Sequence, residues 1–389
     1  MKYSKLYYLF ISLVLISCTR KKEKTTEFDK NLIDIQQKEI CFPSSDILQL
    51  KSYYLSSAVH NDPAKILVGY NYKEHALDYI NLTTQKISQV TLYNDGPNMI
   101  SRLAEIYAHS VDSIWVFDDS ERISLISQKG NITKRINSHD YIQDHEEIII
   151  HTNHAISTTH LGYNPKHQSL LFAVKDKSTS PISFKVKEVF LNETGKTITF
   201  DLSPSVVEPD ISQGYANMNE PNVNFNGEEI LYNYPIESHI YTLNTFTGER
   251  TTIDASSQYT SNKANKCPST TDYSKWQIHG IENPHFFDVM YIPEYQMYAR
   301  LHFAGTTFDT HKNLDTIAYE RDLYLMLFDK SFKKVYESKL ASNRFNPYTG
   351  WNTINNGIIL FVDNIHDKND SDNLIVDIIH PDYLQTASR

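Results

Sequence analysis

Histidine, aspartate and glutamate are concentrated between residues 139 and 160. Imidazole and carboxylate groups can bind Zn²⁺ when three of them converge on one point. His145-Glu146-Glu147 begins like the zinc-binding helix of a metalloprotease, but Ile149 stands where the second histidine would be. The candidate ligands are His139, His145, His151, His154 and His160, with Asp140, Asp144, Glu146 and Glu147. Because their spacing is not compact, we predict an exposed polar loop without a metal ion, with a zinc site as the alternative.

Sequence signatures of several catalytic classes are absent. The chain has no G-x-S-x-G elbow, no glycine-rich phosphate loop, no G-x-G-x-x-G and no C-x-x-C. Asp367, Asp370 and Asp372 lack the spacing and the distal glutamate of a calcium loop, so we predict a solvated turn there. We therefore expect no cofactor and name no catalytic residue. Catalytic groups assembled from distant residues would leave no such signature.

Four side chains are candidates for ligand binding, namely Arg102, Arg300, Arg344 and Trp351. A guanidinium group can bind a carboxylate or phosphate through two hydrogen bonds, and an indole ring can stack on a sugar or a peptide. The alternative is that each of them joins neighbouring sheets and has a purely structural role.

The N-terminus has the order of residues found in a secretory signal peptide. Lys2 and Lys5 precede an apolar run over residues 6–16, which is too short to span a bilayer because spanning needs roughly 20 residues. Cys18 follows Leu15-Ile16-Ser17, and this arrangement resembles the lipobox of bacterial lipoproteins. The resemblance implies that Cys18 is lipidated and becomes the first residue of the mature chain. We expect a protein of the bacterial cell envelope, anchored through Cys18 to the outer membrane.

The composition suggests three segments. Residues 1–17 are the predicted signal peptide, residues 18–40 a lipidated, polar and flexible tether, and residues 41–389 one folded domain. A formal net charge of −10 argues against a nucleic-acid partner, which requires a basic face. Cys41 and Cys267 are far apart in sequence, and both a disulfide and two separate buried thiols remain open.

From about residue 45 onward, the pattern is that of short β-strands. The clearest unit covers residues 104–137, where alternating segments at 113–117, 122–126 and 132–136 are separated by polar turns. This is a four-stranded antiparallel meander, as in one blade of a β-propeller. Trp115 and Phe117 are two residues apart on a strand and share a face, so we predict that both are in the core.

The same unit recurs in degenerate form. The six units cover residues 50–92, 104–137, 167–202, 222–254, 285–340 and 349–380. We therefore predict an all-β fold, a six-bladed β-propeller of four-stranded antiparallel blades. The unassigned stretch 254–285 leaves a seventh blade open. A pair of β-sandwiches is the rival, although no linker rich in proline, glycine and serine separates two halves.

Two motifs complete the pattern, namely Tyr291-Ile-Pro-Glu-Tyr-Gln-Met-Tyr-Ala-Arg300 and Asn343-Arg-Phe-Asn-Pro-Tyr-Thr-Gly350. With the lipobox, the polar tether and the six weak blades, they resemble the propeller lipoproteins of Bacteroidetes of the DUF4221 type. The resemblance covers most of residues 40–385. It implies a TolB-like or NHL-like six-bladed propeller in the cell envelope, and it transfers no catalytic residue to this chain.

The functional expectation is a binding or scaffold module for a peptide, a glycan or a protein partner. The alternative is a metal-dependent hydrolase, or a lactonase- or lyase-like enzyme, on a six-bladed propeller. That reading requires carboxylate and asparagine side chains from several blades at the centre of the propeller.

Overall fold

The computed structural model describes residues 32–43, 50–59, 65–152, 157–362 and 373–383. The chain divides into two units, Met1–Lys30 and Asn31–Arg389, and every described residue belongs to the second. Cys18, His154 and the acidic run 367–372 lie outside the described residues. Among the described residues, no helix has the length and apolar character needed to cross a membrane.

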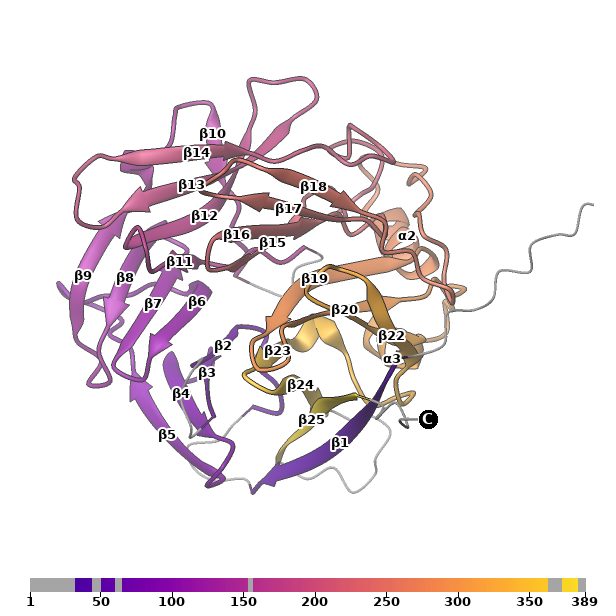
Figure 1. The fold of residues 1–389 in the computed structure, drawn as a ribbon, viewed down its shortest axis with the longest axis horizontal. Coiled ribbons are helices and arrows are strands. Elements are labelled where there is room, and N and C mark those ends of the chain that lie inside the picture. The colour runs from indigo at the N-terminus through magenta and orange to yellow at the C-terminus, as the bar shows by residue number, and fades with distance from the viewer. Residues whose placement is uncertain (1–31, 44–49, 60–64, 153–156, 363–372, 384–389) are drawn as a thin grey trace, which may run out of the picture. The chain divides into compact units, whose positions relative to one another are not determined.

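Six antiparallel sheets follow one another in chain order around a common centre (Figure 1). Blade one comprises β2 (Ser56–Ala58), β3 (Ile66–Asn71), β4 (Ala76–Asn81) and β5 (Lys86–Thr91). Blade two comprises β6 (Leu103–Ser110), β7 (Ser113–Asp118), β8 (Arg122–Ile126) and β9 (Ile132–Asn137). Blade three comprises β10 (Glu146–Ile148), β11 (Gly162–Asn164), β12 (Ser169–Asp176), β13 (Ser183–Phe190) and β14 (Thr197–Asp201).

The remaining three blades complete the circle. Blade four comprises β15 (Asn222–Asn226), β16 (Glu229–Asn233), β17 (Ile240–Asn244) and β18 (Arg250–Ile253). Blade five comprises β19 (His285–Ile292), β20 (Met297–Phe303), β21 (Leu323–Phe328) and β22 (Lys334–Lys339). Blade six comprises β23 (Trp351–Ile354), β24 (Gly357–Val362), β25 (Leu374–Tyr383) and β1 (Ile33–Phe42). The predicted six-bladed propeller is confirmed.

Asparagine residues close many of the hairpins. The side-chain oxygen of Asn71 accepts hydrogen bonds from the backbone N–H groups two and three residues further on, between β3 and β4. Asn81, Asn164 and Asn244 make the same turn at the ends of β4, β11 and β17. Such turns satisfy backbone donors locally, which is why polar residues regularly interrupt the strand pattern.

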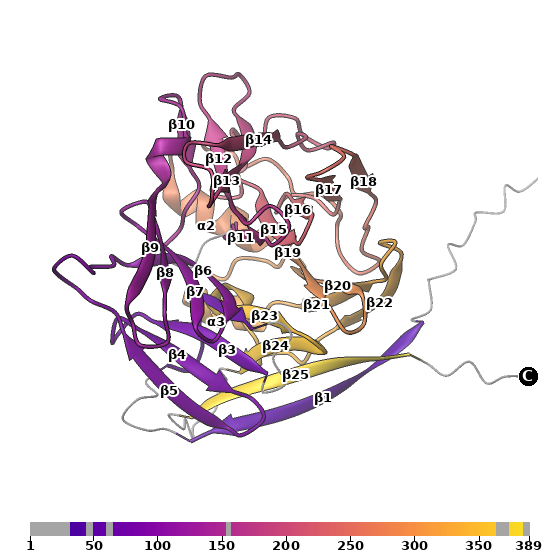
Figure 2. The same ribbon diagram turned by 60° about the vertical axis from the view of Figure 1, so that its left-hand side comes forward.

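The outer strand of blade six comes from the other end of the chain. β1 pairs antiparallel with β25 over its whole length, from Ile33 opposite Tyr383 to Phe42 opposite Leu374 (Figure 2). The predicted domain boundary at residue 41 is therefore wrong, since residues 33–40 belong to a strand and not to the tether. β1 looks like a tether in the sequence because most of its side chains are exposed and polar.

The core consists of six apolar clusters, one at each junction between neighbouring blades. Trp115 and Phe117 are 3% and 0% exposed and belong to the cluster between blades two and three, as predicted. The ring of Phe117 packs edge-on against Phe172 of blade three, with centroids 5.8 Å apart. The blades are therefore held together chiefly by apolar contact.

Residues 254–284 do not form a seventh blade. This stretch contains the helix α2 (Tyr273–Glu282), which is capped by Asp272. The side chain of Asp272 accepts hydrogen bonds from the N–H groups of Ser274 and Lys275. A second short helix, α3 (Leu314–Glu320), lies between β20 and β21. Cys41 and Cys267 are both free, with Cys41 exposed and Cys267 buried. The two cysteines are thus separate, but only one of them is a buried thiol.

Candidate functional site

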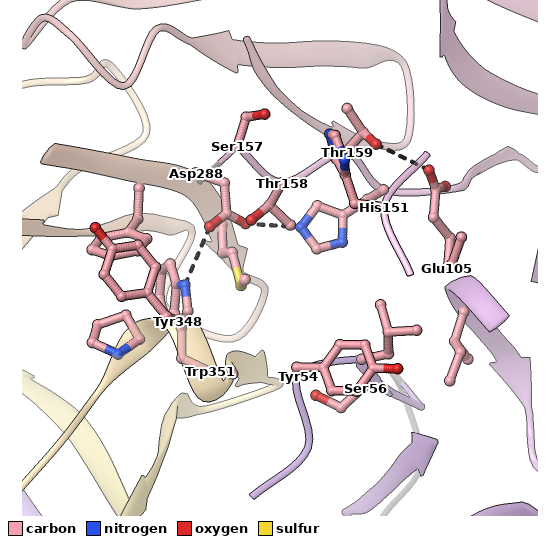
Figure 3. A pocket seen from close by; sticks show the side chains of 18 residues that line it. Tyr54, Ser56, Glu105, His151, Ser157, Thr158, Thr159, Asp288, Tyr348 and Trp351 are labelled. Carbon is pink, nitrogen blue, oxygen red and sulfur yellow. Dashed lines mark hydrogen bonds and ion pairs between the residues drawn. The ribbon is translucent and has the colours of Figure 1, made fainter. Parts of the chain in front are cut away.

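A pocket opens among the innermost strands and is lined by five of the six blades. We call it the axial pocket, and it encloses about 710 Å³ of empty space, including the part open to solvent. Its lining comprises residues 54–56, 104–106, 151 and 157–160, then Phe287, Asp288, Met290, Pro347, Tyr348, Gly350 and Trp351 (Figure 3).

The inner strands bring these residues together because they form a closed ring. β2 contacts β6 and β23, β6 contacts β11, β11 contacts β15, β15 contacts β19, and β19 contacts β23. A second pocket is lined by Tyr107, Tyr163, Asn224, Tyr291 and Asn352, among others. Ser56, Ile106, His160 and Met290 line both pockets, so these side chains separate the two.

Blade three contributes its residues through an interrupted inner strand. β10 and β11 both pair with β12, and the described residues between them, 149–152 and 157–161, belong to neither strand. The last part of this segment runs beside β15, where the N–H of His160 donates to the carbonyl oxygen of Val223, at 2.9 Å. His151, Thr159 and His160 thereby reach the axial pocket. The predicted exposed loop over residues 139–160 is therefore wrong for this part of the segment.

Two register shifts position the pocket's buried carboxyl groups. In the pairing of β19 with β20 the register shifts between Phe286 and Val289, which flank Asp288. In the pairing of β6 with β7 it shifts between Leu103 and Glu105. A β-bulge redirects side chains relative to regular alternation and is common beside functional sites. Both Asp288 and Glu105 are nearly fully buried and line the pocket.

Asp288 is held by two hydrogen bonds from different blades. The Nε2 atom of His160 lies 2.8 Å from its Oδ2. The indole Nε1–H of Trp351 donates to its Oδ1 at 3.2 Å (Figure 3). Because both carboxylate oxygens are engaged, the three side chains fix one another across blades three, five and six. The Asp288 carboxylate is 1% exposed, whereas the imidazole of His160 is 23% exposed.

Glu105 is the second buried acid of the pocket. Its Oε1 accepts a hydrogen bond from the hydroxyl of Thr159 at 3.0 Å, and Oε2 has no hydrogen-bond partner among the described residues. Burial raises the pKa of Glu105 to about 8, and the Thr159 hydrogen bond opposes this rise only partly. Glu105 is therefore mainly protonated at neutral pH when the pocket is empty.

His151 connects the pocket to a partly buried ion pair. Its Nε2 lies 3.0 Å from Oε2 of Glu220, and Oε1 of Glu220 accepts from the Lys175 ammonium group at 3.0 Å. Burial disfavours the charged form of Glu220, but the hydrogen bonds with His151 and Lys175 outweigh it and lower its pKa to about 2. Glu220 is thus ionised and already paired.

Gly350 allows the chain to turn into β23 beside the pocket. Its φ is +117°, in the region that favours glycine, and a Cβ atom there would collide with the carbonyl oxygen of Tyr53. Asn346 precedes this turn and accepts a hydrogen bond from the N–H of Tyr348, in the 3₁₀ helix η2 (Pro347–Thr349). The Asn343–Gly350 motif of the sequence therefore places Tyr348 and Trp351 at the pocket.

Of the four predicted ligand-binding residues, Trp351 lines the axial pocket and Arg102 lies beside it. Arg102 interacts with the hydroxyl of Tyr54, which is a lining residue. Burial raises the pKa of Tyr54, and Arg102 acts in the opposite direction. Arg102 is exposed, so its position is that of a residue at the rim.

Arg300 and Arg344 lie elsewhere and have structural partners. Arg300 is 0% exposed on β20 and donates to the carbonyl oxygens of Ser238, at 2.6 Å, and Ala255, at 2.8 Å. Arg344 donates two hydrogen bonds to Asp377 of β25 and one to Glu39 of β1. The structure therefore does not place these two arginines in the axial pocket, because blade packing and blade closure use their guanidinium groups.

The described residues contain one cluster of the kind that can hold a metal ion. His145, Glu146 and Asp176 bring their ligand atoms within 4.8 Å of one another, outside the axial pocket. Lysine side chains already pair with the two acids. Lys187 lies 2.7 Å from Glu146, and Lys185 lies 2.7 Å from Asp176. The charges of both carboxylates are therefore already balanced by ammonium groups.

The inner-strand ring and the six blades define the chain as a six-bladed β-propeller with a pocket at its centre. The chain belongs to the DUF4221 family, a domain of unknown function, whose model matches residues 17–339. The expected family resemblance is thus confirmed.

Solved structures share the fold. A DUF4221 family member from Bacteroides vulgatus has 14% sequence identity and a TM-score of 0.66, over 92% of this chain and 100% of that one. A putative exported protein from Bacteroides fragilis has 11% identity and a TM-score of 0.52, over 90% and 97%. Comparison with proteins of curated function gave no match. At these identities the likeness concerns the fold alone.

Proposed function

We propose that this protein is a lipid-anchored envelope protein whose propeller binds a peptide, a glycan or part of a protein partner in the axial pocket. One observation supports this most directly. The pocket combines an aromatic wall with buried polar groups that face a solvent-connected space. Such a combination is typical of sites that bind a small or terminal chemical group. The aromatic residues are Tyr54, Phe287, Tyr348 and Trp351.

The geometry favours binding over hydrolysis. An Asp–His pair can also act as the base of a covalent hydrolase, in which it activates a hydroxyl or thiol nucleophile within hydrogen-bond reach. Among the described residues, the imidazole of His160 hydrogen-bonds only to Asp288. The metal-dependent alternative has no supporting cluster among the described residues of the pocket, since the one candidate group lies outside it.

Ligand-observed NMR with a panel of short peptides and oligosaccharides tests this proposal. We expect at least one compound to bind the parent protein and to lose measurable binding with Trp351→Ala, because that change removes the ring and the hydrogen bond to Asp288. Trp276→Ala is the matched control, since Trp276 lies on α2 and does not line the pocket. Binding that survives Trp351→Ala, or a panel without any binder, contradicts the proposal.

A further inference from the structure

We infer that the axial pocket recognises a primary ammonium group, and that the carboxyl of Glu105 is the anion that pairs with it. This inference rests on the proposed binding function and specifies the chemistry of the ligand. The lining charge, the aromatic wall and one unsatisfied acceptor support it.

The charge of the lining suits a cation. The described lining residues include two carboxyl groups, those of Glu105 and Asp288, and neither lysine nor arginine. A ligand carboxylate or phosphate would therefore meet no lysine or arginine among them and would lie near the carboxylate of Asp288. The rings of Tyr54, Tyr348 and Trp351 can in addition hold a cation over their faces, which strengthens as water is excluded.

The hydrogen-bonding groups of the pocket narrow the class of ligand to molecules with N–H groups. Both oxygens of Asp288 are already engaged by His160 and Trp351. Glu105 is 3% exposed, and its Oε2 is without a partner among the described residues. When the carboxyl is ionised, Oε2 is a buried acceptor that needs a donor, because buried polar atoms without a partner are uncommon in folded proteins. A primary ammonium group supplies both a donor and a positive charge, whereas a quaternary ammonium group supplies only the charge.

Binding of a cation would change the protonation of Glu105. Its raised pKa keeps the carboxyl neutral in the empty pocket, and an adjacent ammonium group favours the ionised form. Binding should therefore release one proton from Glu105. The titratable groups that share the pocket are Tyr54, His151, His160, Asp288 and Tyr348, and strands in contact with β6 add Tyr70, Asp118 and Tyr163. A Glu105 variant is needed to distinguish proton release by Glu105 from proton release by these other groups.

Three probes of similar size test the chemistry. Benzylamine carries a primary ammonium group, benzyltrimethylammonium carries a charge without N–H groups, and N-benzylacetamide is neutral. We expect benzylamine to bind at least about tenfold more tightly than either of the others, as charge-assisted hydrogen bonds outweigh neutral ones. Between pH 6 and 8 its affinity should rise by up to about tenfold per pH unit, because Glu105 must lose a proton.

Glu105→Gln is the decisive variant, because an amide keeps the shape and the acceptor for Thr159 but cannot ionise. The affinity of this variant for benzylamine should be at least about tenfold lower than that of the parent. The affinity of the variant should also change less with pH, because the part of the pH dependence that comes from Glu105 is removed. Glu193→Gln is the matched control, since Glu193 is an exposed acid between β13 and β14. An unchanged affinity in Glu105→Gln, with a melting temperature like that of the parent, overturns the inference.

The probe measurements also distinguish failure of this inference from failure of the proposed function. If N-benzylacetamide or a neutral sugar binds as tightly as benzylamine and depends on Trp351, the pocket is a binding site but not an ammonium site. If a divalent metal ion binds with dependence on Glu105 and benzylamine does not, the ammonium assignment is equally wrong. If no probe and no panel compound binds, both proposals fail.

Discussion

Glu105 and Arg300 show two outcomes for an ionisable side chain that folding removes from water. Glu105 has one neutral donor, Thr159, and burial raises its pKa to about 8. Burial lowers the pKa of Arg300 to about 9, which still leaves it charged at neutral pH. Two carbonyl oxygens and the ring of Phe286, 4.9 Å from the guanidinium carbon, take the place of water. Glu105 can therefore change its charge near neutral pH, whereas Arg300 keeps its charge.

The stability of the empty protein should report the state of Glu105. The fold retains a proton on Glu105 between pH 4.5, its ordinary pKa, and about 8, while the unfolded chain has released it. A raised carboxyl pKa contributes stability that is present below pH 4.5 and is lost as the pH rises towards 8. The free energy of unfolding of the parent should therefore fall relative to Glu105→Gln, by up to about 1.4 kcal/mol per pH unit. Denaturant titrations of both proteins at several pH values measure this, and parallel pH profiles would contradict it.

Arg300 should affect stability and leave ligand binding intact. Arg300→Ala leaves the carbonyl oxygens of Ser238 and Ala255 without their donor and creates a cavity, so we expect a loss of about 3 kcal/mol or more. Arg250→Ala, at an exposed arginine on β18, should stay within about 0.5 kcal/mol of the parent. Urea unfolding measures both. An Arg300→Ala protein of parental stability that has lost ligand binding would instead return Arg300 to the list of binding residues.

At the scale of elements, irregular strands build the site. The inner strand of blade three is divided into β10 and β11, and the chain between them supplies His151 and His160 to the pocket. The bulges in β6 and β19 turn Glu105 and Asp288 into the same pocket. Regular strands would alternate these side chains between blade interfaces. The pocket therefore forms where the inner strands depart from regular pairing and alternation.

The closing strand β1 provides a prediction at this scale. Phe42 is 1% exposed and lies in the cluster between blades six and one, whereas the adjacent Cys41 is exposed. Phe42→Ala should lower the free energy of unfolding by about 3–5 kcal/mol, and Cys41→Ala by less than about 0.5 kcal/mol. Thermal and urea unfolding compare the two. Equal stability of both variants would mean that β1 does not close the propeller.

At the scale of the whole molecule, the closed ring makes the pocket a shared product of distant segments. β1 and β25 join the two ends of the described chain in one sheet. Arg344, in the segment before β23, donates hydrogen bonds to residues of both strands. Because each inner strand contacts its two neighbours, displacement of one blade would change the separation of the pocket groups. Stability and site geometry should therefore be coupled in this protein.

Anchoring is the prediction that concerns the molecule in the cell. The order of residues before Cys18 predicts lipidation at its thiol, so Cys18→Ala should move the protein from the membrane fraction to the soluble fraction. Cys41→Ala is the control and should remain with the membrane. Fractionation with a carbonate wash and immunodetection measures this. A Cys18→Ala protein that stays in the washed membranes would show that the anchor lies elsewhere.

The sequence alone determined the class and repeat of the fold. Each blade is a run of consecutive hairpins, so local alternation and polar turns report it directly. Trp115 and Phe117 were assigned to the core from their spacing, and their burial agrees. Trp351 was also a candidate for ligand binding, and it lines the axial pocket. These features depend on neighbours in the chain, which a sequence displays.

Only the tertiary structure decided which polar residues form the site. Glu105 and Asp288 sit within apolar strands, and no local pattern signals the bulges that redirect them. Arg300 resembles a ligand-binding residue in the sequence, but the neighbouring blade supplies its partners from more than forty residues away. β1 looks like a polar tether because an outer strand exposes most of its side chains. These outcomes depend on contacts between distant segments, and those contacts arise only when the ring of blades closes.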